Sequence, residues 1–199
     1  MGKELEWKLA VPDAATLDAV LAWEELRELL RETPRQYHMQ TTYFDDSARS
    51  LFSRRITLRR RLENETVVFC VKAPLPELAE TALRGEWEVC CQTLAEALPL
   101  LAAQGAPALP DCATLHPICG ADFRRRAALL RFADGSACEL ALDCGTLSGP
   151  TETAPLCELE LEMKVGAPDA TLALLRRLAA RFALSPEMHS KSVRARSLR

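Results

Sequence analysis

The sequence lacks the features that are typical of membrane proteins, of zinc-binding proteins and of nucleic-acid coat proteins. No apolar run approaches the roughly 20 residues that cross a bilayer, and residues 1–9 alternate charge and bulk without an apolar signal core. None of the eight cysteines forms a C-x-x-C pair, the usual spacing of zinc sites, so reduced thiols are expected. The net charge is −3, whereas nucleic-acid coat proteins are basic. These absences predict a cytoplasmic protein without a membrane or nucleic-acid partner.

The composition and the hydrophobic periodicity predict an α+β domain that spans residues 1–199. Of the 199 residues, 48% are hydrophobic and 27% are charged, which are ordinary values for one globular domain. Period-2 alternation predicts strands at 3–11, 36–44, 56–62, 66–72, 84–91, 123–132, 136–143 and 156–165. Helical periodicity predicts helices at 13–31, 93–104 and 169–182. Residues 146–155 are expected to form a loop, and 185–199 a polar, basic tail.

Charged residues follow one face of most of these strands. Side chains at alternate positions of a strand share a face, and here most of the rows carry charge of a single sign. The rows are Glu4, Glu6 and Lys8; Arg59 and Arg61; Arg84, Glu86 and Glu88; Arg124 and Arg126; Glu139 and Asp143; and Glu158, Glu160 and Glu162. The predicted helices can cover only the apolar face. An antiparallel β-barrel with a charged lumen and outer helices satisfies both demands.

The contents of this lumen indicate a metal-bound polyanion. Rows of carboxylates without histidine suit a hard divalent ion such as Mg²⁺ or Mn²⁺. Rows of arginine and lysine suit an anion with many oxygens, because the guanidinium group binds phosphate through two parallel hydrogen bonds. A triphosphate with two divalent ions fits both rows.

Motifs along the chain resemble those of the CYTH superfamily, the triphosphate tunnel metalloenzymes, in the order that the family shows. In the first half of the chain, the segments that resemble the family motifs ExExK, YFD, LRxR, VK and RxExE are, in that order, Glu4-Leu5-Glu6-Trp7-Lys8, Tyr43-Phe44-Asp45, Leu58-Arg59-Arg60-Arg61, Val71-Lys72 and Arg84-Gly85-Glu86-Trp87-Glu88. In the second half, the segments that resemble K/R-x-R, E…DxG, ELELE and the late SK are Arg124-Arg125-Arg126, Glu139 with Asp143-Cys144-Gly145, Glu158-Leu159-Glu160-Leu161-Glu162 and Ser190-Lys191. The sequence departs from the family at Asp46, where threonine is usual, and in the tail after Lys191, which lacks the usual aromatic residue and glycine.

The resemblance implies an eight-stranded antiparallel tunnel and, most closely, a bacterial inorganic triphosphatase. Such an enzyme hydrolyses inorganic triphosphate to pyrophosphate and phosphate with Mg²⁺ or Mn²⁺. The expected metal ligands are Glu4, Glu6, Glu158 and Glu160, and the expected catalytic residues are Lys8, Glu4 and Glu6. The expected phosphate ligands are Lys8, Arg59, Arg61, Lys72, Arg124, Arg126 and Lys191. Supporting residues of the tunnel are Arg84, Glu86, Glu88, Glu139, Asp143 and Glu162.

The sequence leaves several readings of the function open. Within the same family, a class IV adenylate cyclase or a hydrolase of thiamine triphosphate or nucleotides is the alternative. A polyphosphate-binding module without turnover is the alternative from another class. A downstream CHAD domain, fused or lost, is the protein partner that the resemblance suggests, and the chain is expected to be a monomer or a dimer.

Overall fold

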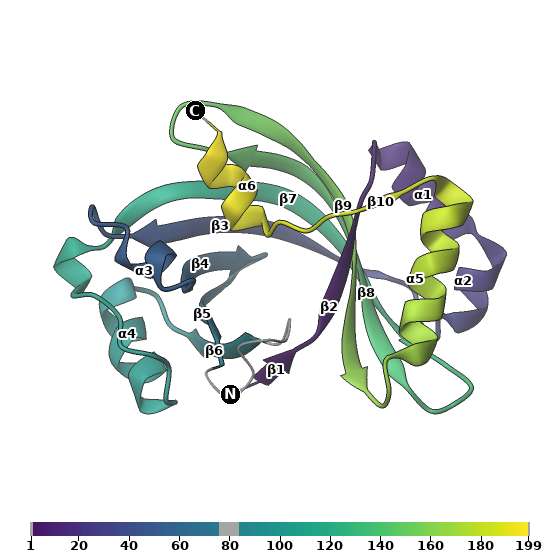
Figure 1. Cartoon of the computed structure of the whole chain (residues 1–199), viewed down its shortest axis with the longest axis horizontal. Helices are drawn as coiled ribbons and strands as arrows, with labels where there is room; N and C mark the ends of the chain where they lie inside the picture. Colours follow the sequence, from purple (N-terminus) through teal and green to yellow (C-terminus); the bar gives the residue numbers. More distant parts are fainter. Residues whose placement is uncertain (1, 76–83, 199) are drawn as a thin grey trace.

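The computed structural model describes residues 2–75 and 84–198 and shows an α+β fold built on one large antiparallel sheet (Figure 1). The described strands are β1 (Gly2–Glu4), β2 (Glu6–Ala10), β3 (Arg35–Asp45), β4 (Thr57–Glu63), β5 (Thr66–Pro74), β6 (Arg84–Cys90), β7 (His116–Arg131), β8 (Ala137–Ser148), β9 (Thr153–Val165) and β10 (Ser185–Pro186). The described helices are α1 (Ala14–Ala22), α2 (Glu24–Leu29), α3 (Ser50–Ser53), α4 (Leu94–Ala103), α5 (Asp169–Phe182) and α6 (Lys191–Ser197), with a 3₁₀ turn at Cys112–Thr114. The predicted fold class is confirmed.

The sheet is a curved antiparallel ladder that hydrogen bonds do not close. Its order is β1-β6-β5-β4-β3-β7-β8-β9-β2-β10, so the described residues form ten strands where eight were expected. The predicted first strand is divided at Leu5. Its beginning, β1, pairs with β6, and its continuation, β2, pairs with β9. The chain itself therefore joins the two sides of the sheet.

Helices cover the outer face of the sheet on two sides (Figure 1). Leu17 of α1 and Leu178 of α5 are fully buried in one core, together with Leu140 and Leu159 of the sheet. A second core packs α3 and α4 against the outward side chains of β4–β6, including Phe69. Burying one such large apolar side chain contributes about 1.5–3 kcal/mol. These two cores fix which face of each strand turns inward. No helix within 2–75 and 84–198 combines the length and hydropathy that a membrane crossing requires.

The predicted helix at 13–31 is two helices. Trp23 has an extended backbone, with φ −66° and ψ 125°, and it ends α1 and begins α2. Its ring packs edge-on against Phe182 of α5, with 6.0 Å between the ring centroids. Apolar residues of both helices, Leu17 of α1 and Leu26 of α2, are buried in the same core. The apolar spacing therefore continued through Trp23 and did not reveal the break.

The segments expected as a loop and a tail are ordered elements. β8 and β9 remain paired as far as Ser148 and Thr153, so most of residues 146–155 is strand. Residues 191–197 form α6, which lies on the concave side of the sheet (Figure 1). Ala195 of α6 is buried with Phe123 and Leu147 in a third core on that side. Glycine, serine and proline lower the strand propensity of residues 146–155, but the pairing of β8 with β9 outweighs this low propensity.

Candidate active site

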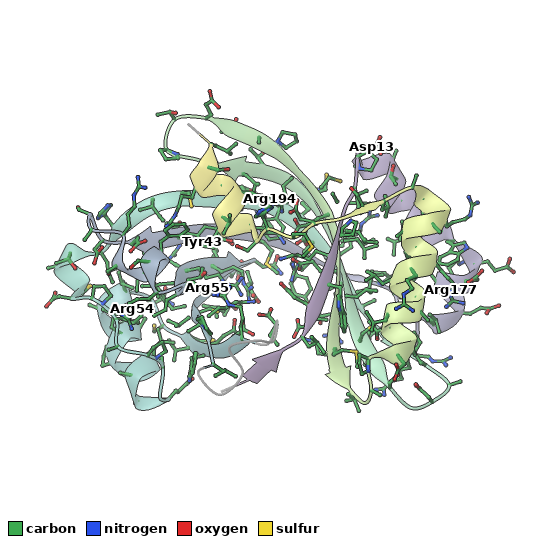
Figure 2. The ribbon with its side chains drawn as sticks, in the orientation of Figure 1. Asp13, Tyr43, Arg54, Arg55, Arg177 and Arg194 are labelled. Carbon is green, nitrogen blue, oxygen red and sulfur yellow. The ribbon has the colours of Figure 1, made fainter. Side chains whose placement is uncertain are left out.

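One continuous face of the sheet carries the charged rows. Outward neighbours such as Leu58, Val71, Trp87 and Leu159 are buried under the helices, so the residues alternating with them turn inward. This inner face carries most of the predicted site residues: Glu4, Glu6, Lys8, Arg59, Arg61, Lys72, Arg84, Glu86, Glu88, Glu139, Asp143, Glu158, Glu160 and Glu162, with Lys191 reaching it from α6. Figure 2 shows Tyr43 and Arg194 on this enclosed side, whereas Arg177 and Asp13 lie among the outer helices.

Three carboxylates converge where β8 meets β9. Oxygens of Asp143, Glu158 and Glu160 all lie within 4.8 Å of one another. Asp143 and Glu158 face each other across the ladder and are fully buried. Lys191 inserts its ammonium among the three, with Nζ 2.7 Å from Asp143 Oδ2, 2.9 Å from Glu160 Oε1 and in contact with Glu158. The cluster is an all-oxygen site that a cation of the chain itself now fills.

Burial and mutual contact shift the ionisation of this cluster. Burial is the largest influence on Glu158. Together with the neighbouring Glu160 it raises the pKa of this carboxyl to about 7, although Lys191 and Arg194 act in the opposite direction. Burial acts in the same direction on Glu160, but Lys191 and Arg125 outweigh it and hold the pKa of that carboxyl well below its usual range. For Lys191, burial lowers the pKa, and the three carboxylates more than offset that effect, so the ammonium stays charged.

A second charged cluster lies on β1, β4, β5 and β6. Lys72 contacts Glu4 and places its Nζ 3.3 Å from Glu86 Oε1. Arg59 lies 3.5 Å from Glu86 and 3.6 Å from Glu88, and Arg61 lies 3.5 Å from Glu88.

These two arginines are incompletely satisfied. The Nε atoms of Arg59 and Arg61 are buried, and neither has a hydrogen-bond partner among the described residues. A buried donor without an acceptor costs about 1–3 kcal/mol. The two guanidinium groups thus offer unmet donors to an anion.

The predicted metal ligands are divided between neighbouring groups. Glu158 and Glu160 belong to the three-carboxylate cluster, whereas Glu4 contacts Lys72 and Glu6 lies 3.3 Å from Lys8. Glu6 is nevertheless in electrostatic range of the cluster, because burial first and Glu160 second raise the pKa of its carboxyl. Asp143, expected only as a supporting residue, is the third acid of the cluster.

The structure corrects the inward positions of β7 by one residue. Arg124 is exposed on the outer face, and Arg126 pairs there with Asp18 of α1 at 2.6 Å. Arg125, between them, turns inward and holds Asp143 through two hydrogen bonds of 2.7 Å. Three consecutive arginines hide the phase of the alternation. The apolar residues Ala128 and Leu130, which belong to the outer face, carry the signal that would have assigned it.

Arg194 is a site residue that the sequence analysis missed. It contacts Glu158 and lies 3.3 Å from Glu187, while Lys191, three residues earlier on α6, also contacts Glu158. Residues three apart share a helix face, so this pair would have been visible had the tail been predicted as a helix.

Comparisons with known proteins agree with this arrangement. The CYTH domain model matches residues 2–195. The chain belongs to the CYTH domain family. Among solved structures, the chain resembles a Hippeastrum protein that is named as a candidate adenylyl cyclase and is said to reveal a dominant triphosphatase activity. The two sequences are 19% identical, and the structures match with a TM-score of 0.59 over 97% of this chain and 94% of the other. A candidate adenylate cyclase from Bacillus halodurans is 18% identical with a TM-score of 0.57, covering 98% of both chains. The PH1819 protein of Pyrococcus horikoshii is 20% identical with a TM-score of 0.56, covering 94% of both.

The residues present fit the divalent ion on which enzymes of this family depend. CYTH enzymes act on triphosphates with a metal ion, and hard divalent ions prefer carboxylate oxygens. Asp143, Glu158 and Glu160 form such a set without nitrogen or sulfur. A second described group, Cys70 with Glu86 and Glu88, includes a thiol and suits such an ion less well. The three-carboxylate cluster is therefore the better candidate metal centre.

Proposed function

We propose that this chain hydrolyses inorganic triphosphate to pyrophosphate and phosphate, with Mg²⁺ or Mn²⁺ as the metal. The observation that carries the proposal is the pair of buried Nε donors of Arg59 and Arg61, which lack partners on the same inner face as three converging carboxylates. A polyanion with a bound cation meets the needs of both groups at once.

Different residues of the chain bind the phosphates and hold the metal. Arg59, Arg61 and Lys72 bind phosphate oxygens and exchange their present carboxylate partners for them. Asp143, Glu158 and Glu160 would hold the metal, which neutralises charge on the phosphates and lowers the pKa of a bound water.

Lys8 positions the water. It lies opposite Glu160 in the ladder and hydrogen-bonds Glu6 at 3.3 Å, so its ammonium lies beside the acidic row that would hold the metal.

Two alternative functions determine which substrates and products the test has to measure. The names of two structural neighbours favour adenylate cyclase, which would convert ATP to cyclic AMP and release pyrophosphate. The aromatic residues Tyr43 and Phe123 of the inner face pack in the third core, so neither offers a free ring for adenine. A binding module without turnover needs the cationic row but not three converging acids.

The test measures phosphate release from inorganic triphosphate, ATP and thiamine triphosphate, with and without Mg²⁺ or Mn²⁺, and measures cyclic AMP in the ATP arm. We expect metal-dependent release that is fastest with inorganic triphosphate. Cyclic AMP as the main product would replace the proposal by the cyclase, and binding of triphosphate without release would replace it by the binding module.

A matched pair of variants ties the activity to the inner face. Arg59→Ala removes an inward guanidinium, whereas Arg60→Ala removes its outward neighbour on the same strand. Removing one such charged contact to the reacting phosphates costs about 10²–10³-fold in rate. We expect a loss of that size from Arg59→Ala and near-normal activity from Arg60→Ala; equal losses would contradict the inner-face site.

A further inference from the structure

Cys144 and Cys157 lie directly opposite each other on β8 and β9. Both are reduced and half-buried on the outer face, and burial first and the neighbouring Cys144 second raise the pKa of the Cys157 thiol. No other pair of cysteines faces each other across the ladder in the described parts of the sheet, because the partners of the remaining strand cysteines are other residue types.

The backbone places these two cysteines in the closer of the two kinds of antiparallel pair. The carbonyl of Cys157 accepts a hydrogen bond from the amide of Val11 at 3.1 Å, on the side away from β8. The N–H and C=O of one strand residue point to the same side, so Cys157 exchanges no backbone hydrogen bonds with Cys144. The Cα atoms of such non-hydrogen-bonded pairs are about 4.5 Å apart, and disulfides span Cα separations of about 4.4–6.8 Å.

The cysteine pair lies immediately behind the three-carboxylate cluster. Asp143 precedes Cys144 on β8, and Glu158 follows Cys157 on β9. The two acids therefore form the next pair of the same ladder, and their side chains lie on the opposite face of the sheet. Drawing the outer side chains together rotates the two strands about their axes. That rotation moves the inner side chains of Asp143 and Glu158 apart.

We propose that Cys144 and Cys157 are a redox site that closes to a disulfide and loosens the carboxylate cluster behind it. With a peroxide as oxidant, one thiol sulfur attacks a peroxide oxygen and becomes a sulfenic acid as water leaves. The second thiol attacks that sulfur, forms the S–S bond and releases a second water. The two thiols lose two electrons and the peroxide gains them. A dithiol reductant reverses the reaction. The effect on the cluster rests on the proposed metal centre, whereas the disulfide does not.

The first test counts thiols after one equivalent of hydrogen peroxide. We expect the wild-type chain to fall from eight free thiols to six, and peptide mapping to find residues 144 and 157 in one linked fragment. Cys144→Ser and Cys157→Ser should each keep all their thiols, and Cys112→Ser, which leaves the pair intact, should still lose two. Circular dichroism checks that each variant is folded. If only one of Cys144→Ser and Cys157→Ser folds, that variant alone is enough for the thiol-count test. An unchanged thiol count, or a loss of two that persists in Cys144→Ser, overturns the redox site.

The second test compares Mn²⁺ binding by calorimetry before and after oxidation. We expect the disulfide to raise the dissociation constant about tenfold, the low end of what changes around the ligands of a metal site produce, and reduction to restore it. Equal affinities of the two forms would overturn the action on the cluster. Failure of the reduced chain to bind Mn²⁺ would instead overturn the proposed metal centre, while the thiol count still decides the disulfide.

Discussion

At the scale of single residues, position on one face or the other of a strand decides the role of chemically identical side chains. Arg124 and Arg125 are consecutive, yet one is exposed on the outer face and the other holds the buried Asp143 and the partly buried Glu160. Arg125 lies 2.7 Å from Asp143 and 2.5 Å from Glu160. Since a buried charge is tolerated only when it is paired, the fold requires Arg125 whether or not it also touches substrate.

We predict that Arg125→Ala destabilises the protein by about 3 kcal/mol, because it leaves Asp143 buried with one partner fewer. Arg124→Ala, at an exposed position, should change the free energy of unfolding by less than about 0.5 kcal/mol. Urea denaturation of both variants measures the difference. Equal effects would mean that the two side chains are not on opposite faces.

At the scale of elements, α6 connects the end of the chain to the site, whereas α4 only covers the sheet. Both helices begin with a capped turn. Thr93 accepts a hydrogen bond from the amide of Glu96 at 3.3 Å, and Ser190 accepts one from the amide of Val193 at 3.3 Å. Only α6 presents side chains, Lys191 among them, to the carboxylate cluster.

We predict that Thr93→Ala and Ser190→Ala each lower the free energy of unfolding by about 1 kcal/mol, the usual value of a lost N-cap. For a chain of this length that lowers the melting temperature by about 2–4 °C. Phosphate release should fall only in Ser190→Ala, because fraying of α6 displaces Lys191. A loss of activity in Thr93→Ala that matches the other variant would show that α6 has no special connection to the site.

At the scale of the whole molecule, stability should depend on pH through the cluster. Because burial raises the pKa of Glu158 to about 7, from its ordinary value of 4.5, the folded chain keeps a proton that the unfolded chain has released between these pH values. The free energy of unfolding therefore falls as pH rises through this window. Glu160, whose pKa is lowered, acts in the opposite direction and only below pH 4.5.

We predict that metal-free protein in EDTA loses about 1–3 kcal/mol of stability between pH 5 and pH 7.5 through Glu158. Glu158→Gln should flatten this part of the profile, whereas Glu152→Gln, at an exposed position outside the cluster, should preserve it. Thermal unfolding at several pH values measures the slope. A profile that is the same in wild type and Glu158→Gln would contradict the raised pKa.

Much of the site was readable from residue order because a strand has a period of two. The rows Glu4 and Glu6, Arg59 and Arg61, and Glu158 and Glu160 sit on the inner face as their spacing predicted. Runs of one residue type carry no such information, which is why Arg124 and Arg126 were chosen in place of Arg125.

The sequence by itself determined the α+β class, the alternation of most strands and the family motifs, because these depend on local spacing. Only the tertiary structure decided that Asp143 joins Glu158 and Glu160, that Lys191 and Arg194 reach them from α6, and that Cys144 lies against Cys157. Lys191 and Glu158 are 33 residues apart in the chain, and the contacts between β8 and β9 depend on how these two strands are aligned. The register between strands and the docking of α6 on the concave face set them, and no short-range pattern encodes either.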